Sequence, residues 1–229
     1  MRRVANFVLV GAVAAVAVAA AVDSLRDDPK PVPAEVRGEL IYSDADCRRH
    51  GIRLPGLARR DFLTLGCAVF SRADNLGVRD GEVSWFAYPV PGGSTTLLRR
   101  YEVPEERRVI EVAWLQGRRF AAVLSPGELL TVWEGNLQVL GLGRGAFDGL
   151  RASTRGRYFA VRDHGALRVF DREGRELDLP AGHAIAWSPA ERYAAIATGD
   201  EVLIVPAEGG EPLARLSVRA RDLDWRREP

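Results

Sequence analysis

The stretch Ile185–Thr198 reads IAWSPAERYAAIAT, which places a short apolar strand, a tight polar turn and a second apolar strand one after another. Three other stretches share the same plan: Ala68–Asp80 (AVFSRADNLGVRD), Val112–Ser125 (VAWLQGRRFAAVLS) and Leu150–Asp163 (LRASTRGRYFAVRD). The units repeat every 44, 38 and 35 residues when they are aligned on Phe70, Trp114, Ala152 and Trp187. A repeat of this length that contains only strands is typical of the blades of a β-propeller.

Each unit continues with two further strands that are separated by a short polar turn, as in a β-hairpin. The predicted pairs are Val83–Tyr88 with Thr95–Val103, Glu128–Trp133 with Leu137–Leu142, Ala166–Asp171 with Glu176–Pro180, and Glu201–Ala207 with Glu211–Val218. No segment after residue 37 has a sustained helical period with capping residues. We therefore expect residues 38–229 to fold as an all-β domain.

The two ends of this region predict how the domain closes. Residues 39–66 contain the second, third and fourth strands of a unit but lack the first. Asp222–Arg226 (DLDWR) matches a first strand, and its Trp225 comes 38 residues after Trp187. The C-terminal strand is thus expected to complete the N-terminal unit, which removes an exposed sheet edge. The prediction is a five-bladed β-propeller; the alternative is an irregular propeller with one poorly formed blade.

The N-terminus is predicted to be a hydrophobic helix outside this fold. Residues 4–22 (VANFVLVGAVAAVAVAAAV) come after Arg2 and Arg3, and a helix of that length spans about 28 Å, close to a bilayer core. The flanking charges favour a transmembrane anchor with its N-terminus in the cytoplasm and the propeller outside. The alternative is a signal peptide cleaved near residues 19–21, which leaves a secreted or periplasmic protein. Residues 23–37 form a proline-rich linker.

Two strings in the last unit carry a family resemblance. Trp187–Ala195 (WSPAERYAA) and Val202–Pro212 (VLIVPAEGGEP) resemble a TolB-type, WD-like β-propeller repeat. That pattern has Asp-Gly in its turn, where this chain has Ala190-Glu191 and, one unit earlier, Arg155-Gly156. The resemblance implies the propeller fold and no particular partner, because one fold hosts many functions.

The two cysteines are a candidate disulfide. Cys47 falls in a predicted turn of the first unit, and Cys67 begins the first strand of the next. In an up-and-down blade both positions lie at the same end, and disulfides persist outside the cytoplasm. The alternative is two separate buried thiols.

Charge suggests how the domain recognises a partner. The formal net charge is +1 and the basic residues form no long run, which argues against nucleic acid. The turns after the first strands are expected to gather arginines at one end, as candidate partner-binding residues: Arg72, Arg118, Arg155, Arg157, Arg192 and Arg226. The opposite end is expected to gather acidic residues: Asp44, Asp46, Asp80, Glu82, Asp163, Asp200 and Glu201. The alternative is a set of ordinary solvated turns.

Signals of catalysis or cofactor binding are weak. His50, His164 and His183 lie in three different units, and no phosphate-binding loop or hydrolase nucleophile motif is present. We expect no cofactor and no metal, and we expect the recurring tryptophans to pack between blades. The sequence thus favours a non-enzymatic scaffold that binds a protein partner in the cell envelope. A small-molecule or carbohydrate site at the channel mouth is the alternative, and an enzyme with residues scattered over loops is a third possibility.

Overall fold

The computed structural model describes residues 31–65, 76–79, 82–86, 97–101, 108–117, 119–133 and 138–227. The side chains of residues 63–65, 76–101 and 138 are outside this description. Met1–Pro31 and Val32–Pro229 form two compact units. In the described residues the second unit is built of antiparallel strands and turns, which confirms the all-β prediction.

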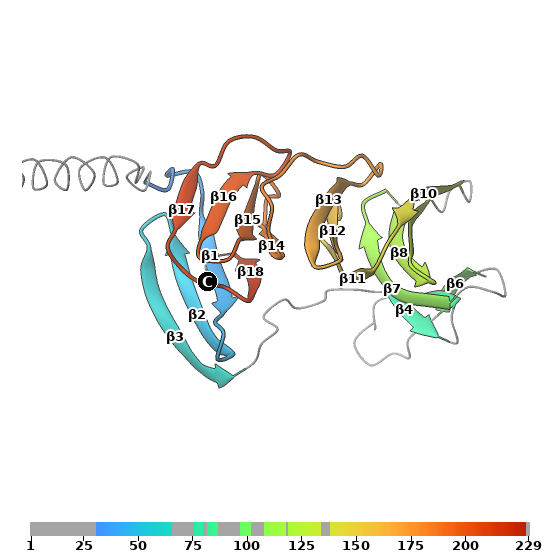
Figure 1. The fold of residues 1–229 in the computed structure, drawn as a ribbon, viewed down its shortest axis with the longest axis horizontal. Coiled ribbons are helices and arrows are strands. Elements are labelled where there is room, and N and C mark those ends of the chain that lie inside the picture. Colours follow the sequence, from blue (N-terminus) through green and yellow to red (C-terminus); the bar gives the residue numbers. More distant parts are fainter. Residues whose placement is uncertain are drawn as a thin grey trace, which may run out of the picture. The chain divides into compact units, whose positions relative to one another are not determined.

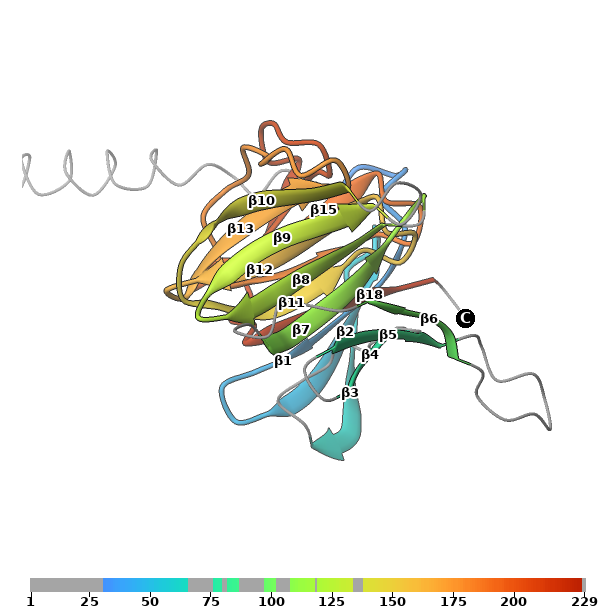
Figure 2. The same ribbon diagram turned by 90° about the vertical axis from the view of Figure 1, so that its right-hand side faces the viewer.

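The described strands form five antiparallel sheets (Figures 1 and 2). The first has the order β18 (Asp222–Arg226), β1 (Gly38–Ser43), β2 (Arg48–Leu54) and β3 (Ala58–Leu65). The second has the order β4 (Leu76–Arg79), β5 (Glu82–Phe86) and β6 (Leu97–Tyr101). The first strand predicted for that second unit, at residues 68–70, lies outside the described residues.

Each of the remaining three sheets is built from strands that follow one another in the chain. The third contains β7 (Arg108–Leu115), β8 (Arg119–Ser125), β9 (Glu128–Trp133) and β10 (Gln138–Arg144), which Figure 2 shows side by side. The fourth contains β11 (Phe147–Ala152), β12 (Tyr158–Asp163) and β13 (Ala166–Asp171). The fifth contains β14 (Ala184–Trp187), β15 (Tyr193–Ala197), β16 (Val202–Pro206) and β17 (Ala214–Leu216). Apart from β18, strands that are consecutive in the chain are neighbours in each sheet, the up-and-down order found in propeller blades.

The C-terminal strand completes the N-terminal sheet, as the sequence predicts. In Figure 1 the red β18 lies beside the blue β1, and the register pairs Leu40 with Trp225 and Tyr42 with Leu223. All six residues of β1 are buried, and the indole N–H of Trp225 donates a hydrogen bond to the carbonyl oxygen of Arg37 at 3.2 Å. The pairing of β1 with β18 is therefore confirmed.

The apolar runs are explained by sheets that bury both faces. In β15, Ala195 and Ala197 belong to a core shared with the first sheet, which includes Leu40. Ala194 and Ile196 point the other way, into a core shared with the fourth sheet. Because successive side chains of a strand alternate between faces, a strand buried on both faces needs a continuous apolar run.

Charged side chains join the first strands of different sheets. The carboxylate of Glu111 in β7 accepts hydrogen bonds from the backbone amides of Gly149 and Leu150 in β11. Arg151, also in β11, forms an ion pair with Asp222 in β18. These contacts connect segments that are distant in sequence without adding apolar area.

One predicted strand is wrong. Residues 176–180 form no strand; they make an isolated bridge between Glu176 and Phe170, and the amide of Leu177 donates to the carbonyl oxygen of Val169 at 2.8 Å. Pro180 has no N–H and cannot extend such a ladder. The last predicted strand is likewise shorter than expected, because β17 contains only Ala214–Leu216.

None of the described segments contains a helix of the length and apolarity that a bilayer crossing requires. The predicted anchor or signal peptide at residues 4–22 lies outside the described residues, as does most of the linker at 23–37. Both therefore remain predictions. The first strand of the domain begins at Gly38.

Candidate binding face

Two turns of the same construction present the candidate arginines. In the fourth sheet, the amide of Ser153 donates to the carbonyl oxygen of Tyr158 at 2.9 Å, and the amide of Tyr158 donates to Oγ of Ser153 at 3.1 Å. In the fifth sheet, Ser188 and Tyr193 make the same two bonds at the same distances. Each turn is closed at its base, so the arginines between these residues project from a fixed backbone.

The fourth residue of each turn has a left-handed backbone and connects its turn to the preceding sheet. Gly156 (φ 69°) accepts a 2.8 Å hydrogen bond from the amide of Gln116 through its carbonyl oxygen. Glu191 (φ 57°) occupies the same place in the next turn, and its carboxylate accepts a hydrogen bond from the amide of Arg155. The Glu191 side chain is buried, with the residue only 1% exposed. Three successive turns are thus bonded to one another.

The first hollow on this face, called the Arg155 hollow, has a volume of about 370 Å³. Arg155, Arg157, Arg172, Arg175, Tyr158 and Glu208 contribute to its lining. Arg172 pairs with Glu173 at 2.7 Å and Arg175 with Asp171 at 3.0 Å. Arg155 and Arg157 are exposed and form no ion pair with any carboxylate that the structure describes. The unpaired positive charge of this hollow therefore comes from the turn itself.

One tyrosine that lines this hollow stays protonated. Burial raises the pKa of the Tyr158 phenol above its usual value, and the nearby Glu208 carboxylate raises it further. The phenol donates a 3.4 Å hydrogen bond to Oε1 of Glu208. The hollow therefore offers neutral hydrogen-bonding groups as well as cations.

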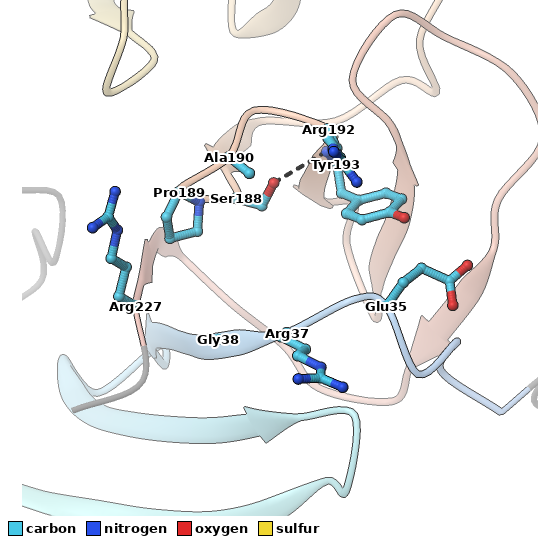
Figure 3. Close-up of a pocket in the computed structure, with 9 residues that line it drawn as sticks. All are labelled: Glu35, Arg37, Gly38, Ser188, Pro189, Ala190, Arg192, Tyr193 and Arg227. Atoms are coloured by element: carbon cyan, nitrogen blue, oxygen red, sulfur yellow. Dashed lines mark hydrogen bonds between the residues drawn. The ribbon is translucent and has the colours of Figure 1, made fainter.

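The second hollow, called the Arg192 hollow, has a volume of about 260 Å³ (Figure 3). Arg37, Arg192 and Arg227 stand around it, and Glu35 and Tyr193 complete one side. The three arginines are exposed, and none forms an ion pair within the described part of the chain. Three cations face one carboxylate here, so this hollow has the larger excess of positive charge.

The structure brings together some of the predicted partner-binding arginines. Arg155 and Arg157 share one hollow and Arg192 lines the other. Arg226 is exposed but binds Asp224 at 2.8 Å and lines neither hollow. Arg72 and Arg118 lie outside the described residues.

Sequence reasoning missed other arginines of this face. Arg172 and Arg175 lie in the turn after the third strand of the fourth sheet, and Arg37 and Arg227 flank the paired strands β1 and β18. In up-and-down order, the turns after the first and third strands emerge at the same end. The strand order alone was thus a sufficient signal for Arg172 and Arg175.

The expected acidic end is largely neutralised. Arginines on neighbouring segments compensate the acidic side chains there: Asp163 with Arg168 at 3.6 Å, Asp200 with Arg219 at 2.9 Å, and Glu201 with Arg215 at 2.7 Å. Asp80 and the side chain of Glu82 lie outside the described residues. Only the charged residues of these turns entered the prediction, and the three arginines come from other turns or strands. These three carboxylates therefore give this end less free negative charge than the sequence suggests.

His50 lies between two carboxylates at this opposite end. Its Nδ1 is 2.7 Å from Oδ1 of Asp61, its Nε2 is 3.0 Å from Oδ2 of Asp44, and its ring stacks on Tyr42. Burial disfavours the charged imidazole, but the hydrogen bonds to Asp61 and Asp44 outweigh it and raise the pKa of His50. The pKa of Asp44 is lowered, first by the His50 hydrogen bond and then by the amide of Arg48.

Replacement of His50 with Asn is expected to flatten the pH dependence of stability. A histidine with a raised folded pKa stabilises the protein fully below its unfolded pKa of about 6.5, and this stability is lost as pH rises through the folded value. The contribution of Asp44 also stabilises the folded state but has the opposite pH dependence: it is lost as pH falls through the lowered pKa of this carboxyl. Melting temperatures of both proteins between pH 5 and 8 give the measurement, with the exposed His164→Asn as control. Parallel curves for wild type and His50→Asn would contradict the prediction.

Cys47 lies in the turn between β1 and β2, with Nη1 of Arg221 at 3.8 Å from its sulfur. Its predicted partner Cys67 lies outside the described residues, so the disulfide stays a prediction. The other two histidines have separate partners: His183 bonds the carbonyl oxygen of Ala220, and His164 bonds Asp163. In the described part of the chain, no group of three His, Cys, Asp or Glu has the geometry to hold a metal ion.

Comparisons with known proteins give a distant likeness in structure alone. No family model and no curated protein matches the sequence. A chain in "Crystal Structure of Mitotic Checkpoint Complex" is similar with a TM-score of 0.40 and 12% identity, over 84% of this chain and 68% of that one. The β-propeller domain of Cps50 (Swd1) from Myceliophteria thermophila is similar with a TM-score of 0.39 and 13% identity, over 82% and 72%. Likeness at this level carries no inference about what this chain binds.

Proposed function

We propose that residues 38–229 form a five-bladed β-propeller that serves as a non-catalytic protein-interaction scaffold. Residues 4–22 tether it to the membrane, with the propeller on the extracytoplasmic side, where it meets a protein partner of the cell envelope. The up-and-down strand order and the sheets buried on both faces support the propeller. Membrane fractionation of chains with and without residues 4–22 tests the tether, which fails if both remain soluble.

One observation carries the binding proposal. Around the two hollows, five exposed arginines have no acidic partner in the described chain: Arg37, Arg155, Arg157, Arg192 and Arg227. Exposed arginines on other parts of the described surface, such as Arg53, Arg59 and Arg144, also lack one, so the distinguishing feature is that these five gather around two hollows. Elsewhere in the described residues, many arginines pair with neighbouring carboxylates, as Arg162 does with Asp148 and Arg215 with Glu201. Cations left unpaired on hydrogen-bonded turns are available to a partner and attract one of opposite charge.

The geometry favours a protein over a small molecule. Sites for small molecules are mostly apolar cavities that enclose the ligand, with few polar groups. The Arg155 hollow is lined mainly by charged side chains, whereas the Arg192 hollow has a more apolar lining with three solvent-facing arginines around it. Open surfaces that combine some apolar lining with exposed charges suit a protein interface, which has a polar rim.

Capture of a partner from envelope membranes tests the proposal. The detergent-solubilised full chain is expected to retain at least one specific protein, and Arg155→Glu with Arg192→Glu is expected to lose it through slower association. The control is Asp46→Arg with Asp200→Arg, which changes charge by the same magnitude at the opposite end and should retain that protein. Retention by the arginine variant, or equal loss by both variants, would contradict the assignment of the binding face.

A further inference from the structure

We propose that the Arg155 hollow and the Arg192 hollow together bind one extended acidic segment of the partner. This inference rests on the proposed function and names the chemistry of what is bound. The ligand is a stretch of polypeptide whose Asp or Glu side chains are separated by neutral residues.

The two hollows are connected through one turn. The turn from Ser188 to Tyr193 contributes Arg192 to its own hollow, and its buried Glu191 bonds the amide of Arg155, which lines the other hollow. Arg155 and Arg192 are therefore held on either side of a single buried carboxylate. The proposed segment runs from one hollow to the other past this turn.

Glu191 is a positioning residue in this arrangement. It has a left-handed backbone, which is uncommon for a residue other than glycine, asparagine or aspartate, and its equivalent in the neighbouring turn is Gly156. A glycine would relieve the backbone but would release the amide of Arg155. The glutamate thus fixes the relative position of two cationic turns, which lowers the entropic cost of binding across both.

The charges around the hollows favour a polypeptide over a nucleic acid. Glu35 borders the Arg192 hollow, and Glu173 and Glu208 border the Arg155 hollow. These carboxylates repel a backbone that carries a phosphate at every nucleotide. A peptide avoids this repulsion by placing neutral or basic residues opposite them, while its own carboxylates pair with the arginines.

Fluorescence anisotropy with synthetic peptides tests the inference. The probes are a labelled 16-residue peptide of alternating Glu and Ser, its 4-residue counterpart, and a 16-residue peptide of alternating Gln and Ser. The detergent-solubilised full chain is expected to bind the long acidic probe, to bind the short one far more weakly, and not to bind the neutral one. Binding should weaken as salt rises, because the contacts are exposed ion pairs.

Variants of each hollow separate two-site binding from attraction to one site. Two double variants are expected to lower the affinity for the long probe about fivefold each: Arg155→Gln with Arg157→Gln, and Arg192→Gln with Arg227→Gln. All four changes together are expected to lower it about 25-fold. The matched control is Arg215→Gln with Arg219→Gln at the opposite end, which should leave affinity unchanged. Glu191→Gly should weaken the long probe while leaving the short probe unaffected.

Three results would overturn the inference. Loss of binding from one pair of substitutions, with no effect of the other, would reduce the site to a single hollow. An equal effect of the Arg215 and Arg219 control would show non-specific attraction. Tighter binding of a 16-nucleotide oligothymidine with the same arginine dependence would assign the face to nucleic acid.

The outcome is distinguishable from failure of the proposed function. If a membrane partner is captured through Arg155 and Arg192 but the acidic probes do not bind, the scaffold proposal holds and the acidic segment is rejected. If the probes bind as expected but no membrane protein depends on these arginines, the acidic-segment site holds and the envelope partner is rejected.

Discussion

Replacement of Trp225 with Ala is expected to lower the free energy of unfolding by about 3–5 kcal/mol, the range for large aromatic side chains removed from a core. Trp225 is 4% exposed, packs in the core shared by the first and fifth sheets, and donates a hydrogen bond to the carbonyl oxygen of Arg37. Its loss creates a cavity and leaves that oxygen without its partner. Urea denaturation monitored by circular dichroism gives the measurement.

The control for this substitution is Trp133→Ala. Trp133 ends β9, is 39% exposed and contacts Arg119 through its ring face. Its removal should cost less than about 1 kcal/mol, as expected for an exposed cation–π contact. Equal losses at the two positions would show that β18 is not part of the core. A chain lacking residues 221–229 should be less stable still, because β1 then becomes an open edge.

The substitution Gly156→Ala is expected to cost about 2–5 kcal/mol, from left-handed backbone strain and overpacking combined. The backbone of Gly156 has φ 69°, and an added Cβ would lie 2.5 Å from the nitrogen of Gln116 and 2.7 Å from Cα of Leu115. Both neighbours are backbone atoms of another sheet, so neither moves without shifting a strand end. Thermal and urea denaturation measure the loss.

Gly165→Ala separates the two causes. Gly165 has φ 83°, and nothing lies within 4 Å of an added Cβ. Alanine there carries the backbone strain alone, about 1–2 kcal/mol. If the two substitutions lower the free energy of unfolding equally, the contact between the Ser153–Tyr158 turn and the preceding sheet does not constrain the fold.

The parts of the fold that could be predicted from the sequence are those set by the local pattern of polar and apolar residues and by the repetition of similar strand units. Ile185–Thr198 folds as β14 and β15 around a turn at the predicted place, because double burial imposes the continuous apolar run of β15. The repeat position of Trp225 was sufficient to pair the two ends of the domain. The segment 176–180 has the alternation of a strand, but its proline interrupts the ladder and limits the pairing to one bridge.

The binding face was harder to predict, since it depends on pairing between distant segments. The sequence indicates which turns carry Arg155 and Arg192, but not that Asp200 and Glu201 would be compensated by Arg219 and Arg215. In the sequence, Glu191 is only a departure from the Asp-Gly turn. Its bond to the neighbouring turn depends on the packing of two sheets, which no local pattern encodes.

The pairing of β18 with β1 also sets the order in which this protein matures on the ribosome. The indole of Trp225 and its acceptor on Arg37 are 188 residues apart in the chain. At usual rates of translation, roughly 10–40 s separate the synthesis of these two partners. During that interval the nascent first sheet presents an open β1, so the sheet can be completed only once Trp225 has left the ribosome, and a chaperone that shields strand edges is expected to bind the growing chain.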